Sequence, residues 1–222
     1  MQKELVIASY DKNLDWLIEL NKNIKITSYR KGELLPLQSN EIKIEPNKGR
    51  CVHTFFNHIY ENYDKLSEYT FFVQDYPFDH WGNLIDILNG DINLITKKCS
   101  LNINNGYFGF HNNALGTAWI LEKSTHFENG YTLRCQNNGY PQDLNPNINV
   151  DKYWEMLFNE NKPDYYEFIP GGHFVITKEY AKLRTKEFYK QIIDMLVSEE
   201  VAPWNFERLE CYIFNSKYKT KL

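Results

Sequence analysis

Acidic and imidazole side chains follow an apolar segment in TFFVQDYPFDH, the stretch from Thr70 to His80. Asp75 and Asp79 stand four residues apart in a loop that contains a proline, and His80 comes directly after them. Carboxylates and imidazoles bind Mg²⁺ or Mn²⁺ and leave coordination positions for phosphate oxygens. The spacing predicts a divalent-cation site made by Asp79, Asp75 and His80. The alternative is a plain turn, because Asp and Pro are frequent turn residues.

A second candidate lies in NKGRCVHTFFNHI, where Gly49 and Arg50 precede a helical pattern. The amino end of a helix attracts anions, and an arginine there adds charged hydrogen-bond donors. We expect His53 and Asn57 to lie off the apolar stripe of this helix. His53 and His58 are five residues apart, which excludes a two-histidine zinc site on one helix face. The alternative is an ordinary helix start.

The third candidate combines PGGHFVITKEYA with PWNFERLECYIF. Paired glycines allow a backbone to approach a ligand closely, and His173 follows them. Trp204 stands near Glu207 and Arg208, which together offer an apolar platform and charged hydrogen-bonding groups suited to a sugar. The alternative for Glu207 and Arg208 is a buried structural ion pair.

Strands and helices alternate around these candidates. Glu4–Tyr10 predicts a buried strand, Asp11 an N-cap for a helix in DKNLDWLIEL, and Ile24–Tyr29 a second strand. A strand, a helix and a strand in this order are typical of a parallel βαβ unit. Lys31–Gly49 is expected to be a loop with a brief strand at EIKIE.

The rest of the chain gives a helix in RCVHTFFNHIYENYDKL, whose apolar residues recur every three or four positions, and a strand in TFFVQ. The Asn- and Gly-rich middle, 90–146, is expected to form long loops. Further on, the patterns predict a helix over Asp151–Phe158, a strand over Gly171–Ile176, and a helical region capped by Thr177. No repeat or linker interrupts the chain, so residues 1–222 are expected to form one α/β domain.

Composition excludes several classes of protein. The net charge of −4 opposes broad nucleic-acid binding, which needs a basic face. No apolar run approaches the roughly 18 residues of a membrane span, and the amino terminus lacks a signal-peptide pattern. The four cysteines show no CxxC spacing, so we expect a cytoplasmic protein without disulfides or a zinc knuckle. The abundant aromatic residues either fill a core or stack on sugars.

Several of these motifs together resemble one protein family. They are N-x-G-R-x-x-H-T-Φ-Φ-x-H-I from Asn47 to Ile59 (Φ is apolar or aromatic), F-x-Q, P-F-D-H, and E-R-L-x-x-x-I-F ending at Phe214. The family is one of unknown function from bacteria, fungi and large viruses. It is similar to small GT-A glycosyltransferases, including one encoded by an alga-infecting virus. The chain departs from the usual GT-A pattern in having no Asp-x-Asp motif.

The resemblance implies a single GT-A-like domain with a central mixed sheet flanked by helices. A nucleotide-sugar donor would lie across the carboxyl ends of the first strands. The implied donor-binding residues are Ala8, Ser9 and Tyr10 beside the nucleotide, Lys31 and Arg50 at the phosphates, and His53.

From the residues and the resemblance together we expect a glycosyltransferase, with a UDP-sugar favoured as donor and Mn²⁺ or Mg²⁺ as cofactor. The acceptor would be a glycan or another hydroxyl compound. If the enzyme inverts the configuration of the sugar, Glu207 is the first choice for the base and Asp75 the second, while His173 and Trp204 would face the acceptor. The alternatives are a non-catalytic carbohydrate-binding protein and a metal-dependent phosphoesterase.

Overall fold

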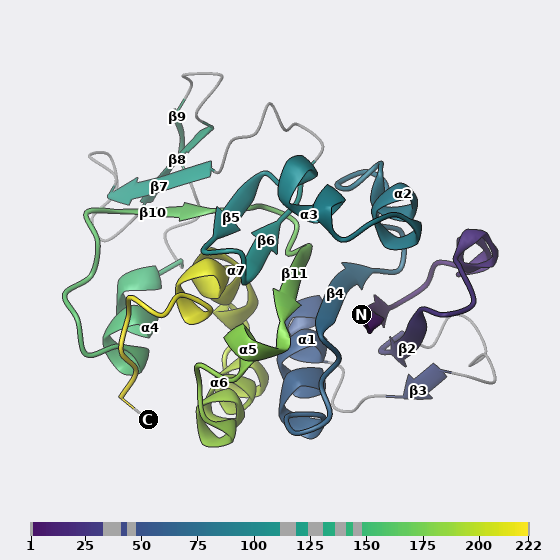
Figure 1. Cartoon of the computed structure of the whole chain (residues 1–222). Coiled ribbons are helices and arrows are strands. Elements are labelled where there is room, and N and C mark those ends of the chain that lie inside the picture. Colours follow the sequence, from purple (N-terminus) through teal and green to yellow (C-terminus); the bar gives the residue numbers. More distant parts are fainter. Residues whose placement is uncertain are drawn as a thin grey trace.

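A mixed sheet forms the centre of the protein in the computed structural model (Figure 1). The structure describes residues 2–32, 41–43, 48–111, 119–123, 131–135, 141–143 and 148–221. The strands are β1 (Lys3–Ser9), β2 (Lys25–Arg30), β3 (Glu41–Lys43), β4 (Tyr69–Gln74), β5 (Leu101–Ile103), β6 (Tyr107–Gly109), β7 (Trp119–Lys123), β8 (Tyr131–Cys135), β9 (Pro141–Asp143), β10 (Tyr165–Phe168) and β11 (Phe174–Thr177). The helices are a 3-10 helix η1 (Asp15–Glu19), α1 (Arg50–Glu61), α2 (Leu84–Asn89), α3 (Asn93–Lys98), α4 (Val150–Leu157), α5 (Lys178–Ala181), α6 (Lys186–Ser198) and α7 (Ala202–Ile213).

The described strands form two sheets. The central sheet has seven strands in the order β3-β2-β1-β4-β11-β6-β5, and the second has four in the order β10-β7-β8-β9. β3, β2, β1 and β4 are parallel, whereas β11 runs antiparallel to β4. The expected α/β class, with a central mixed sheet flanked by helices in a single domain, is confirmed. The predicted parallel pairing of the first two strands is confirmed as well.

Alternating side chains of the central strands point to opposite faces of the sheet. Val6 of β1 and Phe72 of β4 belong to the larger core, which includes α1, α4, α6 and α7. Leu5 and Phe71 belong to the core on the other face, which includes α2 and α3. This alternation is the period of two expected of a strand buried on both faces, so β4 is the buried central strand that TFFVQ predicts.

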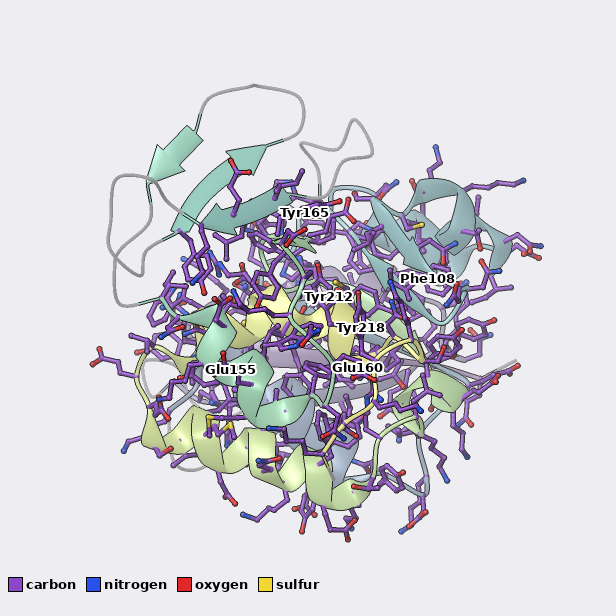
Figure 2. All side chains as sticks on the ribbon, turned by 90° about the vertical axis from the view of Figure 1, so that its left-hand side faces the viewer. Phe108, Glu155, Glu160, Tyr165, Tyr212 and Tyr218 are labelled. Atoms are coloured by element: carbon purple, nitrogen blue, oxygen red, sulfur yellow. The ribbon has the colours of Figure 1, made fainter. Side chains whose placement is uncertain are left out.

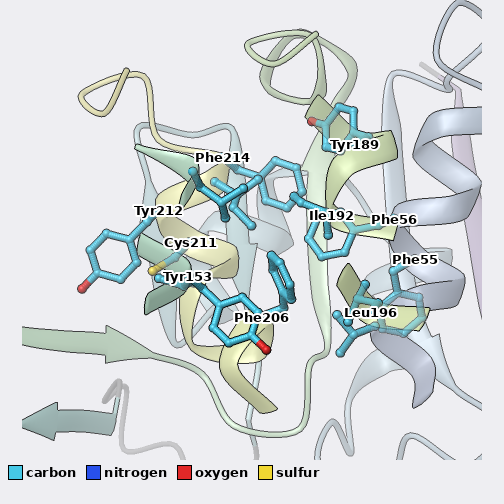
Figure 3. Close-up of a cluster of buried hydrophobic side chains, with 14 of the residues drawn as sticks. Phe55, Phe56, Tyr153, Tyr189, Ile192, Leu196, Phe206, Cys211, Tyr212 and Phe214 are labelled. Carbon is cyan, nitrogen blue, oxygen red and sulfur yellow. The ribbon is translucent and has the colours of Figure 1, made fainter. Parts of the chain in front are cut away.

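Aromatic rings build much of the larger core. The ring of Phe56 on α1 lies between those of Tyr189, Phe206 and Phe214, with centroid distances of 6.1–6.2 Å (Figure 3). The carboxyl-terminal segment is held in the same way, since Tyr218 lies 5.4 Å from Tyr212, centroid to centroid (Figure 2). These contacts fix α1, α6 and α7 against one another, and the ends of these helices surround the site described below.

The middle of the chain corrects one expectation. Residues 90–146 were predicted to be loops, yet α3 and β5 to β9 lie there. β5, β6 and β9 have three residues each, which is too short to show a periodic pattern. Asn104 and Asn105 connect β5 and β6 with positive φ angles of 49° and 59°, a backbone that asparagine tolerates better than most residues. The loops expected at 112–118, 136–140 and 144–147 lie outside the described residues.

Three helix predictions also change. The segment after β1 forms only η1, and Asp11 does not cap it, because the helix begins at Asp15 with Leu14 at its N-cap position. α1 ends at Glu61 rather than continuing to Leu66. The predicted helical region after Thr177 is divided into α5, capped by Thr177, and α6, capped by Thr185.

Candidate functional site

A cavity of about 900 Å³ opens where β1 and β4 end. Ala8 at the end of β1 pairs with Gln74 at the end of β4, so the loops that follow the two strands emerge side by side. The walls of the cavity come from four parts of the chain, residues 8–12, 48–51, 74–79 and 196–204, together with Lys31. The carboxyl edge of parallel strands is the usual ligand site of open α/β sheets, and the volume suits a small organic molecule.

Asp75 holds the loop after β1 in place. Its Oδ2 accepts hydrogen bonds from the backbone N–H groups of Tyr10, Asp11 and Lys12 at 2.9–3.1 Å, and its Oδ1 accepts from the N–H of Tyr76 at 3.0 Å. Both carboxylate oxygens are therefore already engaged with the backbone. This arrangement explains the shape of the cavity wall, and it leaves Asp75 less available as a metal ligand or base than the sequence suggested.

Asp79 has the opposite character. It lines the cavity, and 64% of its side chain is exposed. His80 is adjacent, with Nε2 3.9 Å from Oδ2 of Asp79, but it does not line the cavity. Among the described residues, no group of three or more His, Cys, Asp or Glu side chains is placed to hold a metal ion. The structure thus brings Asp79 to the cavity as a free carboxylate, without a ready-made cation site around it.

The start of α1 forms the wall opposite Asp79. Gly49 and Arg50 both have positive φ, 71° and 52°, so the chain enters the helix through two left-handed residues. A Cβ on Gly49 would lie 2.7 Å from the Cβ of His53, which makes glycine necessary there. The ammonium group of Lys31 donates to the carbonyl oxygens of Lys48 and Arg50 and holds this entry in place.

Positive charge and aromatic rings meet at the rim. Lys12, Lys31, Lys48 and Arg50 all line the cavity. The Arg50 guanidinium lies 5.1 Å from the ring centroid of Trp204, an attractive cation–π contact. Three of the exposed large aromatic residues, Tyr10, Tyr76 and Trp204, line this same cavity. Five acidic residues, Asp11, Asp75, Asp79, Glu199 and Glu200, line the cavity as well, so a planar or sugar-like ligand would match it with its negative charge placed at Arg50.

Ser9 supplies a polar group on the floor of the cavity. The residue is 1% exposed, and its Oγ has no hydrogen-bond partner among the described residues. A buried hydroxyl without a partner costs free energy, so a ligand that hydrogen-bonds to it would recover part of that cost. Ala8 lies beside it in the same wall.

Two predicted site histidines are buried instead. His53 and His173 are 2% and 1% exposed, and neither lines the cavity. His53 was expected to lie off the apolar stripe of α1, but it is one of the buried residues of that helix. Burial lowers the pKa of His53 to about 4, with help from Lys31, and lowers that of His173 to about 3. Nε2 of His173 accepts the backbone N–H of Gln74 at 3.4 Å, so His173 supports the cavity floor from behind.

A row of side chains on α7 leads from the rim into the interior. Trp204, Glu207 and Glu210 follow one another at intervals of three residues, which places them on neighbouring turns of one helix side. Trp204 is 37% exposed, the side chain of Glu207 21%, and Glu210 only 1%. Oε1 of Glu207 is 3.6 Å from Nη1 of Arg208, so the ion pair that was the alternative to a site role is present, and Glu207 lies behind Trp204 without lining the cavity.

A family model of unknown function, DUF3431, matches residues 5–220. The chain belongs to this family. No curated protein and no solved structure matches it. DUF3431 membership therefore leaves the function to be inferred from the cavity itself.

Several cavity residues of this DUF3431 protein were not predicted. The end of α6, residues 196–198, and Glu200 reach the cavity only through the packing of α6 against α1, which no local pattern reveals. Glu210, which is buried and does not line the cavity, had a readable signal in its spacing of three from Glu207 in a helical segment. In the part of the chain that the structure describes, no helix is long and apolar enough to cross a membrane.

Proposed function

We propose that the protein is a glycosyltransferase that binds a nucleotide sugar, with a UDP-sugar favoured, in the cavity at the ends of β1 and β4. One observation carries the proposal. A single cavity combines the amino end of α1 and four cationic side chains with three exposed aromatic rings. The amino end of α1 and the cationic side chains suit a diphosphate. The aromatic rings suit the nucleobase or the sugar of the donor.

The position proposed for the donor matches its negative diphosphate to the positive charge at the start of α1. The diphosphate lies at Arg50 and the first turn of α1, where the free N–H groups and the helix dipole favour an anion. The nucleoside lies along residues 8–10, with the hydroxyl of Ser9 as a hydrogen-bonding partner. Both placements follow the resemblance to GT-A glycosyltransferases.

Transfer is a direct displacement at the anomeric carbon of the donor sugar. The acceptor oxygen forms a bond to that carbon while the bond from the carbon to the diphosphate oxygen breaks, and the diphosphate leaves with the electron pair. The acceptor proton passes to a carboxylate, for which Glu207 remains our choice. Arg50 and its neighbouring lysines stabilise the charge that develops on the diphosphate.

The cavity offers an exposed carboxylate to a divalent cation. Mg²⁺ is commonly held by one or two carboxylates together with water and substrate phosphates. Asp79 is the described residue best suited to that role, with His80 next to it. When bound, Mn²⁺ or Mg²⁺ would add positive charge at the leaving diphosphate.

A thermal-shift screen tests the proposal directly. UDP with Mn²⁺ is expected to raise the melting temperature more than GDP or CMP does, because a ligand at a hundredfold excess over its dissociation constant adds about 2.7 kcal/mol of stability. Stabilisation by GDP or CMP alone would show that the donor is not a UDP-sugar. Stabilisation by free sugars without any nucleotide effect would favour a carbohydrate-binding protein, whose ligands the aromatic rim also suits. Hydrolysis of a phosphoester in place of transfer would favour the phosphoesterase.

Arg50→Ala should weaken UDP binding about 10- to 100-fold, since a hydrogen bond to a charged group contributes about 1.5–3 kcal/mol. Isothermal titration with UDP measures the change. Lys190→Ala is the matched control, because it removes the same charge from an exposed site on α6 that does not line the cavity. Equal affinity of the Arg50 variant and the control, with a lower melting temperature for the Arg50 variant, would show that Arg50 is only structural.

A further inference from the structure

Glu210 is a buried carboxyl group without a partner. It is 1% exposed, and neither of its carboxyl oxygens has a hydrogen-bond partner among the described residues. A buried carboxylate that is neither paired nor hydrogen-bonded is very costly, so such a group takes up a proton instead. Glu210 is therefore the neutral member of the row on α7.

Glu207 has the contacts of an ionised carboxylate. Arg208 lies 3.6 Å away, and the backbone amide of Gly171 also favours the ionised form of Glu207 by lowering its pKa. Burial raises the pKa of Glu207, while Arg208 and Gly171 oppose that change. Burial and the neighbouring Glu207 raise the pKa of Glu210 well above its ordinary value. Glu207 and Glu210 are three residues apart on α7, which places them on neighbouring turns, and two neighbouring carboxyl groups with one arginine beside them favour a state with a single negative charge.

A glycine turn connects this pair to the cavity floor. Gly171 and Gly172 have φ angles of 92° and 63°. The side-chain amide of Gln74, which lines the cavity, donates to the carbonyl oxygen of Gly171 at 3.1 Å. A Cβ on Gly172 would lie 3.7 Å from Oε1 of Glu210, so the turn lies directly over that carboxyl group. Glu210 thus lies beneath the Gly171–Gly172 turn, and the amide of Gly171 lowers the pKa of Glu207.

We propose that Glu207 and Glu210 form an acceptor-side pair with one proton, in which ionised Glu207 takes the proton of the acceptor hydroxyl and neutral Glu210 is a positioning residue beneath the Gly171–Gly172 turn. This deepens the proposed function and rests on it for the chemical step. The proton leaves the acceptor oxygen as that oxygen bonds to the anomeric carbon, and the diphosphate departs with the electrons of the broken bond. Glu210 keeps its own proton throughout.

Charged and titratable neighbours influence how many protons Glu207 and Glu210 hold together. The titratable and charged groups whose charges interact with Glu207 or Glu210 are Arg50, Cys51, His80, Tyr107, Arg208 and Cys211. Burial raises the pKa values of Cys51, Tyr107 and Cys211, so these three are neutral at neutral pH. The arginines are the permanent cations near the pair, and they face Glu207 rather than Glu210.

The proton count is testable without any activity. Carboxyl ¹³C NMR of the full chain labelled at glutamate should show one carboxyl that is still protonated at pH 7. That signal should be absent from Glu210→Gln and present in Glu207→Gln. Loss of the signal from Glu207→Gln alone, or the absence of any glutamate protonated at pH 7, overturns the proposal even if the protein is a glycosyltransferase.

An activity assay distinguishes the roles of Glu207 and Glu210. It measures the UDP that is released when a panel of UDP-sugars is mixed with simple sugar acceptors. Glu207→Gln should lower the rate at least about 100-fold without changing UDP affinity. Glu210→Ala should lower it towards 100-fold by displacing the turn, and Glu210→Gln, which keeps a neutral group of the same shape, should restore most of that loss. Equal losses in both glutamine variants would overturn the assignment. If the wild type binds UDP but releases none from any donor, the transferase function fails, and the NMR result still decides the pair.

Discussion

Replacing Asp75 by alanine should lower the free energy of unfolding by about 2–3 kcal/mol and should abolish measurable UDP binding. The carboxylate accepts four backbone hydrogen bonds, three of them from consecutive residues after β1. Without it, those N–H groups lose their partner and the loop that carries Tyr10 is no longer held against β4. Urea unfolding and titration with UDP measure the two effects.

Asp79→Ala is the matched control for stability. Asp79 lies in the same loop, but 64% of its side chain is exposed, and the described structure gives it only the contact at 3.9 Å with His80. Its replacement should change the unfolding free energy by less than about 0.5 kcal/mol. If both aspartate variants are equally stable, Asp75 does not organise the loop in the way its hydrogen bonds indicate.

Asp79→Asn should lower the rate of sugar transfer by about 10²–10³-fold and should remove the Mn²⁺-dependent part of UDP binding. Asparagine keeps the size of the side chain but loses the negative charge that attracts a cation. The melting temperature of the unliganded protein should stay the same, because the side chain is largely exposed. Calorimetric titration with UDP, with and without Mn²⁺, measures the effect separately from activity.

Two outcomes would count against the metal role. If Asp79→Asn still binds UDP in a fully Mn²⁺-dependent way, DYPFDH is a plain turn and not a metal site. Tight UDP binding by the wild type with no difference between Mn²⁺ and a chelator would mean that Arg50 and the lysines neutralise the diphosphate unaided. In that second case the cavity keeps its proposed donor and loses only its cofactor.

The long, fully buried elements of the fold were readable from the sequence. β1, β4 and α1 carry continuous apolar patterns, because the sheet is covered on both faces and α1 is enclosed by α6 and α7. The three-residue strand β3 was expected within EIKIE, whereas β5, β6 and β9 were not readable, because three residues are too few to show a periodic pattern. Asp11 was misjudged as a helix cap, because the helix after β1 begins only at Asp15, with Leu14 at its N-cap position.

The site was readable wherever a residue follows a strand or begins a helix. Ala8, Ser9, Tyr10, Lys31, Arg50, Asp75, Asp79 and Trp204 were all expected at the site, and all line one cavity. Types and spacing could not show which polar groups are already engaged. Asp75 and Asp79 are the same residue type in the same loop. In the structure Asp75 accepts four backbone hydrogen bonds, whereas the side chain of Asp79 is largely exposed. Burial of His53 and His173 likewise depends on how whole helices and turns pack, which no motif encodes.

The four segments that wall the cavity have a consequence for synthesis of the chain. Residues 8–12 leave the ribosome early, whereas residues 196–204 emerge 184 or more positions later. At roughly 5–20 residues per second, the delay is about 9–40 s. Throughout that interval the early loops lack the helix ends that close the cavity. A ligand of this cavity therefore cannot direct the folding of the nascent chain, and it can stabilise only molecules that have completed α7.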